Sequence, residues 1–394
     1  MKYPDKASWL EINAASLKQN IRIFRDLLDG QNTLGVVLKG NAYGHGLEII
    51  YPLVRSLVDC IYLITPQDAF KVREIERLAK DSRKRIVVLG AVSGEEVVEC
   101  AKQEIEVVIG DPGWEDYLPL LRKSRQTVKA HIHLDTGLAR EGFCSSELES
   151  QLKFLQGQNE IINIIGVMSH FSNTEDTTEQ SYARLQMKEF KGGTERVRHL
   201  LGIQSPLEQH FAASGAILVL PESRFNSVRV GISLFGFWPS PEIQVLAKKS
   251  LKATEMFKPV LSWKCRSQIL KKVKKGSSVG YGCTYRCDQD IWIAVFPVGY
   301  YDGYPRALTG KSHVLINEKR CPVIGRVMMN HFIVDATAAV KEDSGQTEVE
   351  AILLGTSGNE SITAEMVADW AQTIHYEIVT RLGSHLKRVV ISTT

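Results

Sequence analysis

The sequence predicts an α/β protein in which an N-terminal (β/α)8 TIM-type barrel precedes a C-terminal, mainly β domain. Three observations support this prediction. Eight short apolar runs occur between residues 34 and 235, and amphipathic segments with helical spacing alternate with them. Beyond residue 245, strand-like segments joined by Gly, Asn and Asp turns predominate. An open, doubly wound sheet is the alternative for the first part, but no GxGxxG motif opens a helix there.

The eight runs of the expected barrel are short and apolar, as is typical of parallel strands buried on both faces. Before the first run, Leu17, Ile21, Phe24 and Leu28 have the spacing of one helical face. The expected strands lie at residues 34–39, 60–65, 85–90, 105–110, 128–134, 162–169, 208–214 and 225–231.

The chain is expected to divide into an N-terminal strand at residues 1–12, a barrel at 13–245 and a β domain at 246–394. We expect the N-terminal strand to pack with the C-terminal domain. In that domain one helix, at residues 361–374, interrupts the strands. The expected strand segments are 261–273, 277–282, 291–299, 311–316, 321–336, 348–355 and 386–392.

The composition excludes several classes of function. The 394 residues carry 48 basic and 45 acidic side chains, and this net charge of +3 requires neither nucleic acid nor a membrane as partner. The basic cluster at residues 270–278 alternates with apolar positions, as on a solvated strand edge. Because neither an apolar N-terminal segment nor a run of 18 apolar residues occurs, we expect a cytoplasmic protein. Seven scattered cysteines indicate reduced thiols and no metal site.

Polar side chains follow the apolar runs, where the strand ends of a (β/α)8 barrel form its active site. Each alone has a structural explanation, such as a solvated lysine or a helix cap, but together they converge on one mouth. Neither an acidic pair nor an HExxH motif is among them, which argues against glycosidase and zinc chemistry. These residues are Lys39, Asp135, Thr136, Arg140, His170, Ser214, Arg229 and Gly231.

Lys39 favours Schiff-base chemistry, because a lysine forms imines with carbonyl groups when burial and cationic neighbours lower its pKa. Glycine-rich backbone at the last strands and helix N-termini can supply N–H donors to a phosphate group.

Through these residues and the motifs around them, the chain resembles the alanine racemase family over nearly its whole length. The family consists of enzymes that use pyridoxal 5′-phosphate (PLP) and combine an N-terminal barrel with a C-terminal β domain. The motif LKGNAYGHG at residues 38–46 is the most specific point of similarity. By resemblance, Lys39 carries PLP as an imine and acts as a base, and His170 stacks on the pyridine ring. Arg229 is expected to face the pyridine nitrogen.

The remaining cofactor contacts are also implied by the resemblance alone. Tyr43 matches a tyrosine that touches the PLP phosphate, and further phosphate contacts are expected from Ser214, Gly231, Ile232 and Tyr376.

The resemblance also implies a homodimer whose active sites are shared between subunits. Tyr281, in VGYGCTY, matches a second catalytic base that reaches the site from the partner, and Arg140 matches an arginine that contacts that tyrosine and the substrate. Met329 matches the position where partner backbone meets the substrate carboxylate. The resemblance implies that Tyr300, Arg306 and Arg326 line the corridor through which the substrate enters the active site.

The sequence departs from the family pattern around the expected site. His133 stands where many members have a carbamylated lysine that orients the equivalent of Arg140, and a histidine forms no such carbamate. Met328 and Asn330, which flank Met329, and Ala213 are further departures. They leave amino-acid specificity and the orientation of Arg140 open.

The expected function is therefore that of a PLP-dependent isomerase, an alanine racemase that interconverts L- and D-alanine with Lys39 and Tyr281 as two bases and supplies D-alanine for cell-wall peptidoglycan. Racemisation of serine, or of a broad set of amino acids, is the alternative. A non-catalytic PLP-binding protein would need neither the β domain nor Tyr281. A PLP decarboxylase on the same fold would be expected to place a glutamate at the pyridine nitrogen, where this chain has Arg229.

Overall fold

The computed structural model describes residues 7–176, 178–248, 256–341 and 345–392. The chain divides into two compact units, which we treat separately. The segment 40–49, inside the range 13–245 expected for the barrel, groups with the second unit. The barrel unit consists of Leu17–Lys39 and Ile50–Lys258, and the β unit consists of Met1–Ser16, Gly40–Ile49 and Pro259–Thr394.

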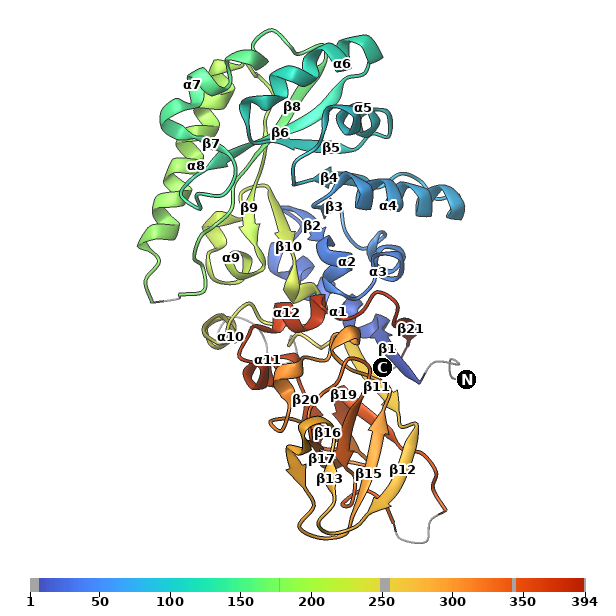
Figure 1. Ribbon diagram of the computed structural model, residues 1–394. Helices are drawn as coiled ribbons and strands as arrows, with labels where there is room; N and C mark the ends of the chain where they lie inside the picture. The colour runs from blue at the N-terminus through green and yellow to red at the C-terminus, as the bar shows by residue number, and fades with distance from the viewer. Residues whose placement is uncertain (1–6, 177, 249–255, 342–344, 393–394) are drawn as a thin grey trace. The chain divides into compact units, whose positions relative to one another are not determined.

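The barrel unit contains eight parallel strands that close on themselves (Figure 1). The strand order is β5, β4, β3, β2, β10, β9, β8, β6, and pairing of β5 with β6 closes the ring. The predicted (β/α)8 barrel is thus confirmed, and the alternative of an open sheet is wrong. The strands are β2 (Thr33–Val37), β3 (Cys60–Leu63), β4 (Arg85–Val88), β5 (Glu106–Ile109), β6 (Val128–Asp135), β8 (Ile162–Met168), β9 (Glu208–Ala213) and β10 (Ser227–Val230), and the short β7 (Phe143–Cys144) adds to β6.

Helices alternate with these strands, and their ends follow from local sequence. α4 begins after Thr65, whose side chain accepts a hydrogen bond from the Asp68 amide, and α5 begins with a capping box between Ser93 and Glu96. The helices are α1 (Ala14–Leu28), α3 (Leu47–Val54), α4 (Pro66–Ala79), α5 (Gly94–Lys102), α6 (Leu118–Ser124), α7 (Leu148–Gln151), α8 (Ser181–Leu200), α9 (Ser214–Val219) and α10 (Pro241–Ala247).

The barrel interior is apolar in one region and polar in another. Side chains including Val37, Val87, Val108 and Met168 form a buried apolar cluster near the strand ends. In contrast, β4, β5, β9 and β10 begin with polar residues, at the amino-terminal end of the barrel, where three carry a formal charge. Branched apolar side chains usually fill such an interior, so this polar layer is a departure that calls for an explanation.

The β unit is built on one large sheet with the order β12, β15, β18, β17, β16, β19, β11, β1, β21 (Figure 1). β1 (Ser8–Asn13) pairs with both β11 and β21, so the first strand of the chain lies inside this sheet. The other strands are β11 (Leu261–Arg266), β12 (Ile269–Val273), β13 (Ser278–Val279), β14 (Tyr285–Arg286), β15 (Ile291–Phe296), β16 (His313–Ile316), β17 (Lys319–Ile324), β18 (Phe332–Asp335), β19 (Glu350–Ser357), β20 (Glu360–Ile362) and β21 (Lys387–Ile391).

Beyond residue 259, the described residues of the β unit contain an α-helix that the sequence did not predict. The helix expected at residues 361–374 is α11 (Ala364–Ala371), which Thr363 caps through a hydrogen bond from the Met366 amide. A second helix, α12 (His375–Thr380), follows directly. Its six residues are too few to show a helical period, so the sequence pattern did not reveal it.

All seven cysteines are free thiols, and five of them are buried. Within the described parts of the chain, no helix combines the length and the apolar character needed to cross a membrane.

Candidate active site at the barrel strand ends

The chain makes a left-handed helical turn directly after β2. Lys39 opens α2 (Lys39–Tyr43), and Gly40, Asn41 and Ala42 have φ angles of 61°, 55° and 54°. The left-handed conformation continues through Tyr43, with φ of 51°. Each residue with a Cβ costs roughly 1–2 kcal/mol in this conformation, so the surrounding structure must impose the turn.

Hydrogen bonds within the β unit hold this turn. The Gly44 amide donates to the Gly40 carbonyl at 2.9 Å, and Arg388 donates to the Gly44 carbonyl through Nη2 at 2.7 Å and Nε at 3.1 Å. The Asn41 side chain accepts from the Leu47 amide at 2.8 Å. The turn places the Tyr43 ring 6.4 Å from the Tyr376 ring, measured between centroids, so two expected phosphate contacts lie together.

Lys39 lies at the carboxyl end of β2, in a positively charged surrounding. Burial lowers the pKa of the Lys39 amine, and the charges of Arg140 and Arg229 lower it further, while Glu141 acts in the opposite direction. A lysine with a lowered pKa carries a larger neutral fraction near pH 7, and the neutral amine is the form that attacks a carbonyl group.

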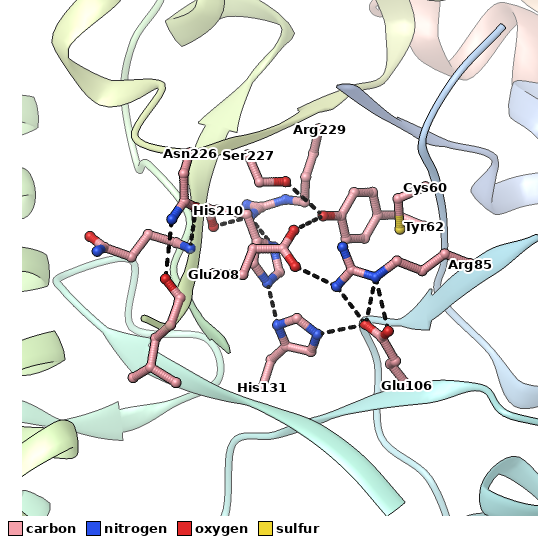
Figure 2. Close-up of polar contacts among 12 residues, drawn as sticks. Cys60, Tyr62, Arg85, Glu106, His131, Glu208, His210, Asn226, Ser227 and Arg229 are labelled. Atoms are coloured by element: carbon pink, nitrogen blue, oxygen red, sulfur yellow. Dashed lines mark hydrogen bonds and ion pairs between the residues drawn. The ribbon is translucent and has the colours of Figure 1, made fainter. Parts of the chain in front are cut away.

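Arg229 on β10 is 2% exposed and lies inside the barrel (Figure 2). Its Nη2 donates to the Ser169 carbonyl at 2.7 Å, and its Nη1 donates to Nδ1 of His210 at 2.9 Å and to the His210 carbonyl. Burial lowers the pKa of Arg229 to about 10, which still leaves the guanidinium protonated near neutrality.

His170 and His133 both stay neutral near pH 7. Burial, followed by the charges of Arg229 and Arg140, lowers the pKa of His170 to about 3 and that of His133 to about 4. A neutral His133 provides no counter-charge for Arg140, which instead pairs with Glu141 through an Nε to Oε2 distance of 3.5 Å.

Two helix starts meet at a buried point near the last two barrel strands. Ser214 opens α9, and its hydroxyl accepts a hydrogen bond from the Gly231 amide at 2.9 Å. Ile232 opens a 3₁₀ helix, Ile232–Phe235, directly after Gly231. Ser214 and Ile232 are 4% and 2% exposed. Backbone N–H groups at helix starts favour anionic ligands, so this point suits a phosphate group.

A separate pocket lies in the β unit, where Tyr281 and Met329 are 71% and 54% exposed. Loop backbone fixes part of it, because the Tyr300 amide donates to the Met328 carbonyl at 3.1 Å. The pocket brings together the expected second base, the expected substrate contact Met329 and the residues of the expected entry corridor. Its lining includes Tyr281, Tyr300, Arg306, Arg326, Met328, Met329 and Asn330.

Comparison with known proteins identifies the family. The models for the N-terminal and C-terminal domains of alanine racemase match residues 12–239 and 260–390. The chain belongs to the alanine racemase family.

Relatives in this family align over almost the full chain. The alanine racemase of Leptospira interrogans serogroup Icterohaemorrhagiae serovar copenhageni is 32% identical, and the alignment covers 98% of this chain and 96% of the relative. The alanine racemase of Methylacidiphilum infernorum is 33% identical, with 97% and 92% covered. Family membership confirms the expected enzyme class, an isomerase of the racemase type.

Solved structures of the family have the same fold. The crystal structure of alanine racemase from Bacillus anthracis with bound L-Ala-P has a TM-score of 0.87 at 29% identity and covers 99% of this chain and 96% of its own. A histidine racemase from Leuconostoc mesenteroides subsp. sake has a TM-score of 0.83 at 24% identity, which shows a common fold alone.

The alanine racemase motifs identified the residues at the strand ends but missed those that support them. Arg388 and Asn41 hold the left-handed turn, and His210 receives hydrogen bonds from Arg229. One signal for the polar layer was available: His131, His133 and His210 occur within strands that should otherwise be apolar. The roles of the individual site residues remain predictions.

Proposed function

We propose that this protein interconverts L- and D-alanine with PLP bound at the mouth of the barrel. The observation that carries the proposal is the position of Lys39 at the end of β2, with its pKa lowered by burial and by Arg140 and Arg229. An amine of this kind is the chemical requirement for holding an aldehyde cofactor.

The residues present fit PLP in their donor types. Lys39 would bind the aldehyde carbon, and Arg229 and the neutral His170 would face the pyridine ring. The buried Ser214 hydroxyl with the backbone of Gly231 and Ile232 would serve the phosphate. The family resemblance assigns the hydroxyls of Tyr43 and Tyr376 to the phosphate as well. When bound, PLP supplies an electron sink that makes the Cα proton of an amino acid acidic.

Arg229 limits how strongly the ring is polarised. The guanidinium retains its protons near pH 7 and donates hydrogen bonds to the Ser169 carbonyl and His210, so it would not transfer a proton to a pyridine nitrogen. A ring that is left unprotonated favours return of the Cα proton over side reactions such as transamination. This property suits a racemase.

Lys39 and Tyr281 would act as the two bases on opposite faces of Cα, one removing the proton and the other returning one. Tyr281 would come from the partner of a homodimer. Its 71% exposure, beside the exposed Met329, supports this assignment, because such a surface is suited to a second subunit. The cationic Arg140 would lower the pKa of the approaching tyrosine.

Chiral chromatography tests the proposal. Purified protein incubated with PLP and L-alanine should produce an equal mixture of L- and D-alanine, and D-alanine should give the same mixture. Serine, lysine and histidine, assayed in parallel, test the alternative of broad specificity. If the PLP-loaded protein converts none of these amino acids, the proposed racemase function is wrong. If it converts serine faster than alanine, serine is the substrate.

The biological role also belongs to this proposal. We propose that the protein acts in the cytoplasm and supplies D-alanine for cell-wall peptidoglycan, on the basis of its family resemblance. A strain that lacks the gene should need added D-alanine for growth if no second racemase is present.

A further inference from the structure

A continuous chain of hydrogen bonds crosses the barrel interior from Arg229 to Glu106 (Figure 2). Arg229 Nη1 lies 2.9 Å from His210 Nδ1, and His210 Nε2 lies 3.0 Å from His131 Nδ1. His131 Nε2 then lies 3.0 Å from Glu106 Oε2. The two histidines and Arg229 are each at most 2% exposed, and Glu106 is 7% exposed. We call these four side chains the interior relay.

The hydrogen-bond chemistry permits one arrangement of protons in the relay. A guanidinium only donates, so His210 Nδ1 must be the bare nitrogen and His210 Nε2 must carry the hydrogen. That hydrogen points at His131 Nδ1, which must also be bare, so His131 donates to Glu106 from Nε2. Both imidazoles are therefore neutral Nε2–H tautomers, oriented by a cation at one end and an anion at the other.

Arg85 fixes the anionic end of the relay. Its guanidinium binds Glu106 through Nε to Oε1 at 2.9 Å and Nη2 to Oε2 at 2.7 Å, and it also pairs with Glu208. Burial alone would raise the pKa of Glu106, but the hydrogen bonds from His131 and Arg85 outweigh it and lower that pKa to about 2. Glu106 is thus a carboxylate throughout the physiological range of pH.

Two glycines on the remaining barrel strands make room for this layer. A Cβ atom on Gly166 of β8 would overlap Nδ1 of His131 and lie 2.7 Å from its Cε1. A Cβ atom on Gly35 of β2 would overlap the Tyr62 ring, which stacks on His210 with ring centroids 5.4 Å apart. Glycine at these two positions therefore leaves the space that the side chains of His131 and Tyr62 occupy.

At the other end, no carboxylate among the described residues hydrogen-bonds Arg229, although the charge of Glu208 acts on the guanidinium without a hydrogen bond. Across the described residues, each hydrogen-bond acceptor of its guanidinium is a carbonyl oxygen or an imidazole nitrogen, from Ser169, His170, His210 and Phe211. A fully buried cation is costly without a counter-charge, and the relay connects this one to Glu106 through two polarisable rings.

We propose that Glu106 and His131 are positioning residues that set the orientation and the charge stabilisation of Arg229 through His210. Resting on the proposed function, this inference makes the electronic environment of the PLP ring depend on a carboxylate at the opposite, amino-terminal end of the barrel. Loss of Glu106 or His131 would therefore alter the orientation and charge stabilisation of Arg229 as well as the stability of the protein. Loss of a residue that only packs would alter stability alone.

The wild-type holoenzyme gives the first test. Long-range ¹H–¹⁵N NMR on protein with ¹⁵N-labelled histidine rings should show His131 and His210 as neutral Nε2–H tautomers, assigned with His131→Gln and His210→Gln. Detection of an Nδ1–H tautomer or an imidazolium at either position would overturn the relay. This measurement does not depend on the folding or the activity of a Glu106 variant.

The second test is Glu106→Gln, with Tyr62→Phe as matched control, since Tyr62 contributes a hydroxyl to the same layer but lies outside the relay. In Glu106→Gln, kcat should fall roughly ten- to hundredfold with KM within about threefold of wild type. The absorption maximum of the bound cofactor and the ring ¹⁵N resonances of His210 should shift. In Tyr62→Phe, which keeps the ring that stacks on His210, kcat, KM and the absorption maximum of the cofactor should stay at wild-type values.

The outcomes separate the two proposals. If wild-type protein binds PLP but does not racemise amino acids, the proposed function fails, while the tautomers and the cofactor absorbance still test the relay. If wild type racemises alanine and Glu106→Gln loses only stability, with unchanged kcat, absorbance and His210 resonances, the layer is structural and the relay proposal is wrong.

Discussion

Gly44 lies so close to Val379 that a Cβ atom on the glycine would overlap the Val379 carbonyl oxygen and stand 2.8 Å from its carbon. Gly44 also has φ of 80°. Two separate constraints, a close backbone approach and a left-handed conformation, therefore require glycine directly after Tyr43.

Gly44→Ala should lower the free energy of unfolding by about 2–4 kcal/mol, because backbone strain and overlap add together. Gly30→Ala is the control: Gly30 has φ of 69°, but a Cβ atom added there would meet nothing within 4 Å, so this variant should lose only about 1 kcal/mol. Urea titrations at one protein concentration would measure both. Equal losses would show that the Val379 contact contributes nothing.

Lys39→Ala should abolish the visible absorbance of enzyme-bound PLP and all racemisation, since no other amine would hold the aldehyde. Lys102→Ala, on an exposed position of α5, should retain both. Absorption spectra of dialysed protein would decide. Persistence of the cofactor band in Lys39→Ala would move the attachment point elsewhere.

Tyr281→Phe should retain cofactor binding but slow exchange of the Cα proton with solvent unequally for L- and D-alanine, because only one face of Cα loses its base. Incorporation of solvent deuterium from each enantiomer, followed by NMR, would measure this. Tyr301→Phe, at another exposed tyrosine of the β unit with 64% exposure, is the matched control and should behave as wild type. Unchanged rates in Tyr281→Phe would remove this tyrosine from the mechanism.

Mixed dimers test whether the active sites are shared. When Lys39→Ala and Tyr281→Phe subunits are unfolded together and refolded, each hybrid dimer should contain one intact and one doubly defective site. With random association, half of the dimers are hybrids, so activity should recover to about one quarter of wild type. If both residues of a site come from one chain, mixing would restore nothing.

His133 should make stability depend on pH. Its folded pKa of about 4 lies below the ordinary value, so the unfolded chain binds a proton first as pH falls, and stability is lost between about pH 6.5 and 4. His133→Gln should reduce the loss between pH 7 and 4.5 by on the order of 2–3 kcal/mol. Urea titrations of both proteins at the two pH values would measure this loss of unfolding free energy. An equal loss in wild type and His133→Gln would contradict a buried, neutral His133.

Sequence patterns predicted the barrel well because each strand is buried on both faces and reads as an unbroken apolar run, as in residues 60–63. The left-handed turn after Lys39 could not be predicted in this way. Among the contacts that hold this turn are the hydrogen bonds from Arg388 to the Gly44 carbonyl, which join residues 344 positions apart in the chain.

The polar layer escaped prediction for a similar reason. Glu106, His131 and His210 are isolated polar residues in separate strands, and periodicity within one strand does not say which residues meet across a closed barrel. Family motifs named Arg229 because it lies at the mouth, but motif matching cannot recover a hydrogen-bond chain that begins on the far side of the barrel.

The place of β1 in the β unit has a consequence for how the protein is made. β1 pairs with β21, so Trp9 near the start of the chain is the neighbour of Lys387 near its end. The barrel unit ends at Lys258 and has all its strands once that residue has left the ribosome. One edge of β1 stays unpaired until β11, which begins at Leu261, has been synthesised, and the other until β21, which begins at Lys387, at some 5–20 residues per second. For that interval the nascent chain carries an open sheet edge, which chaperones of the translating cell would be expected to shield.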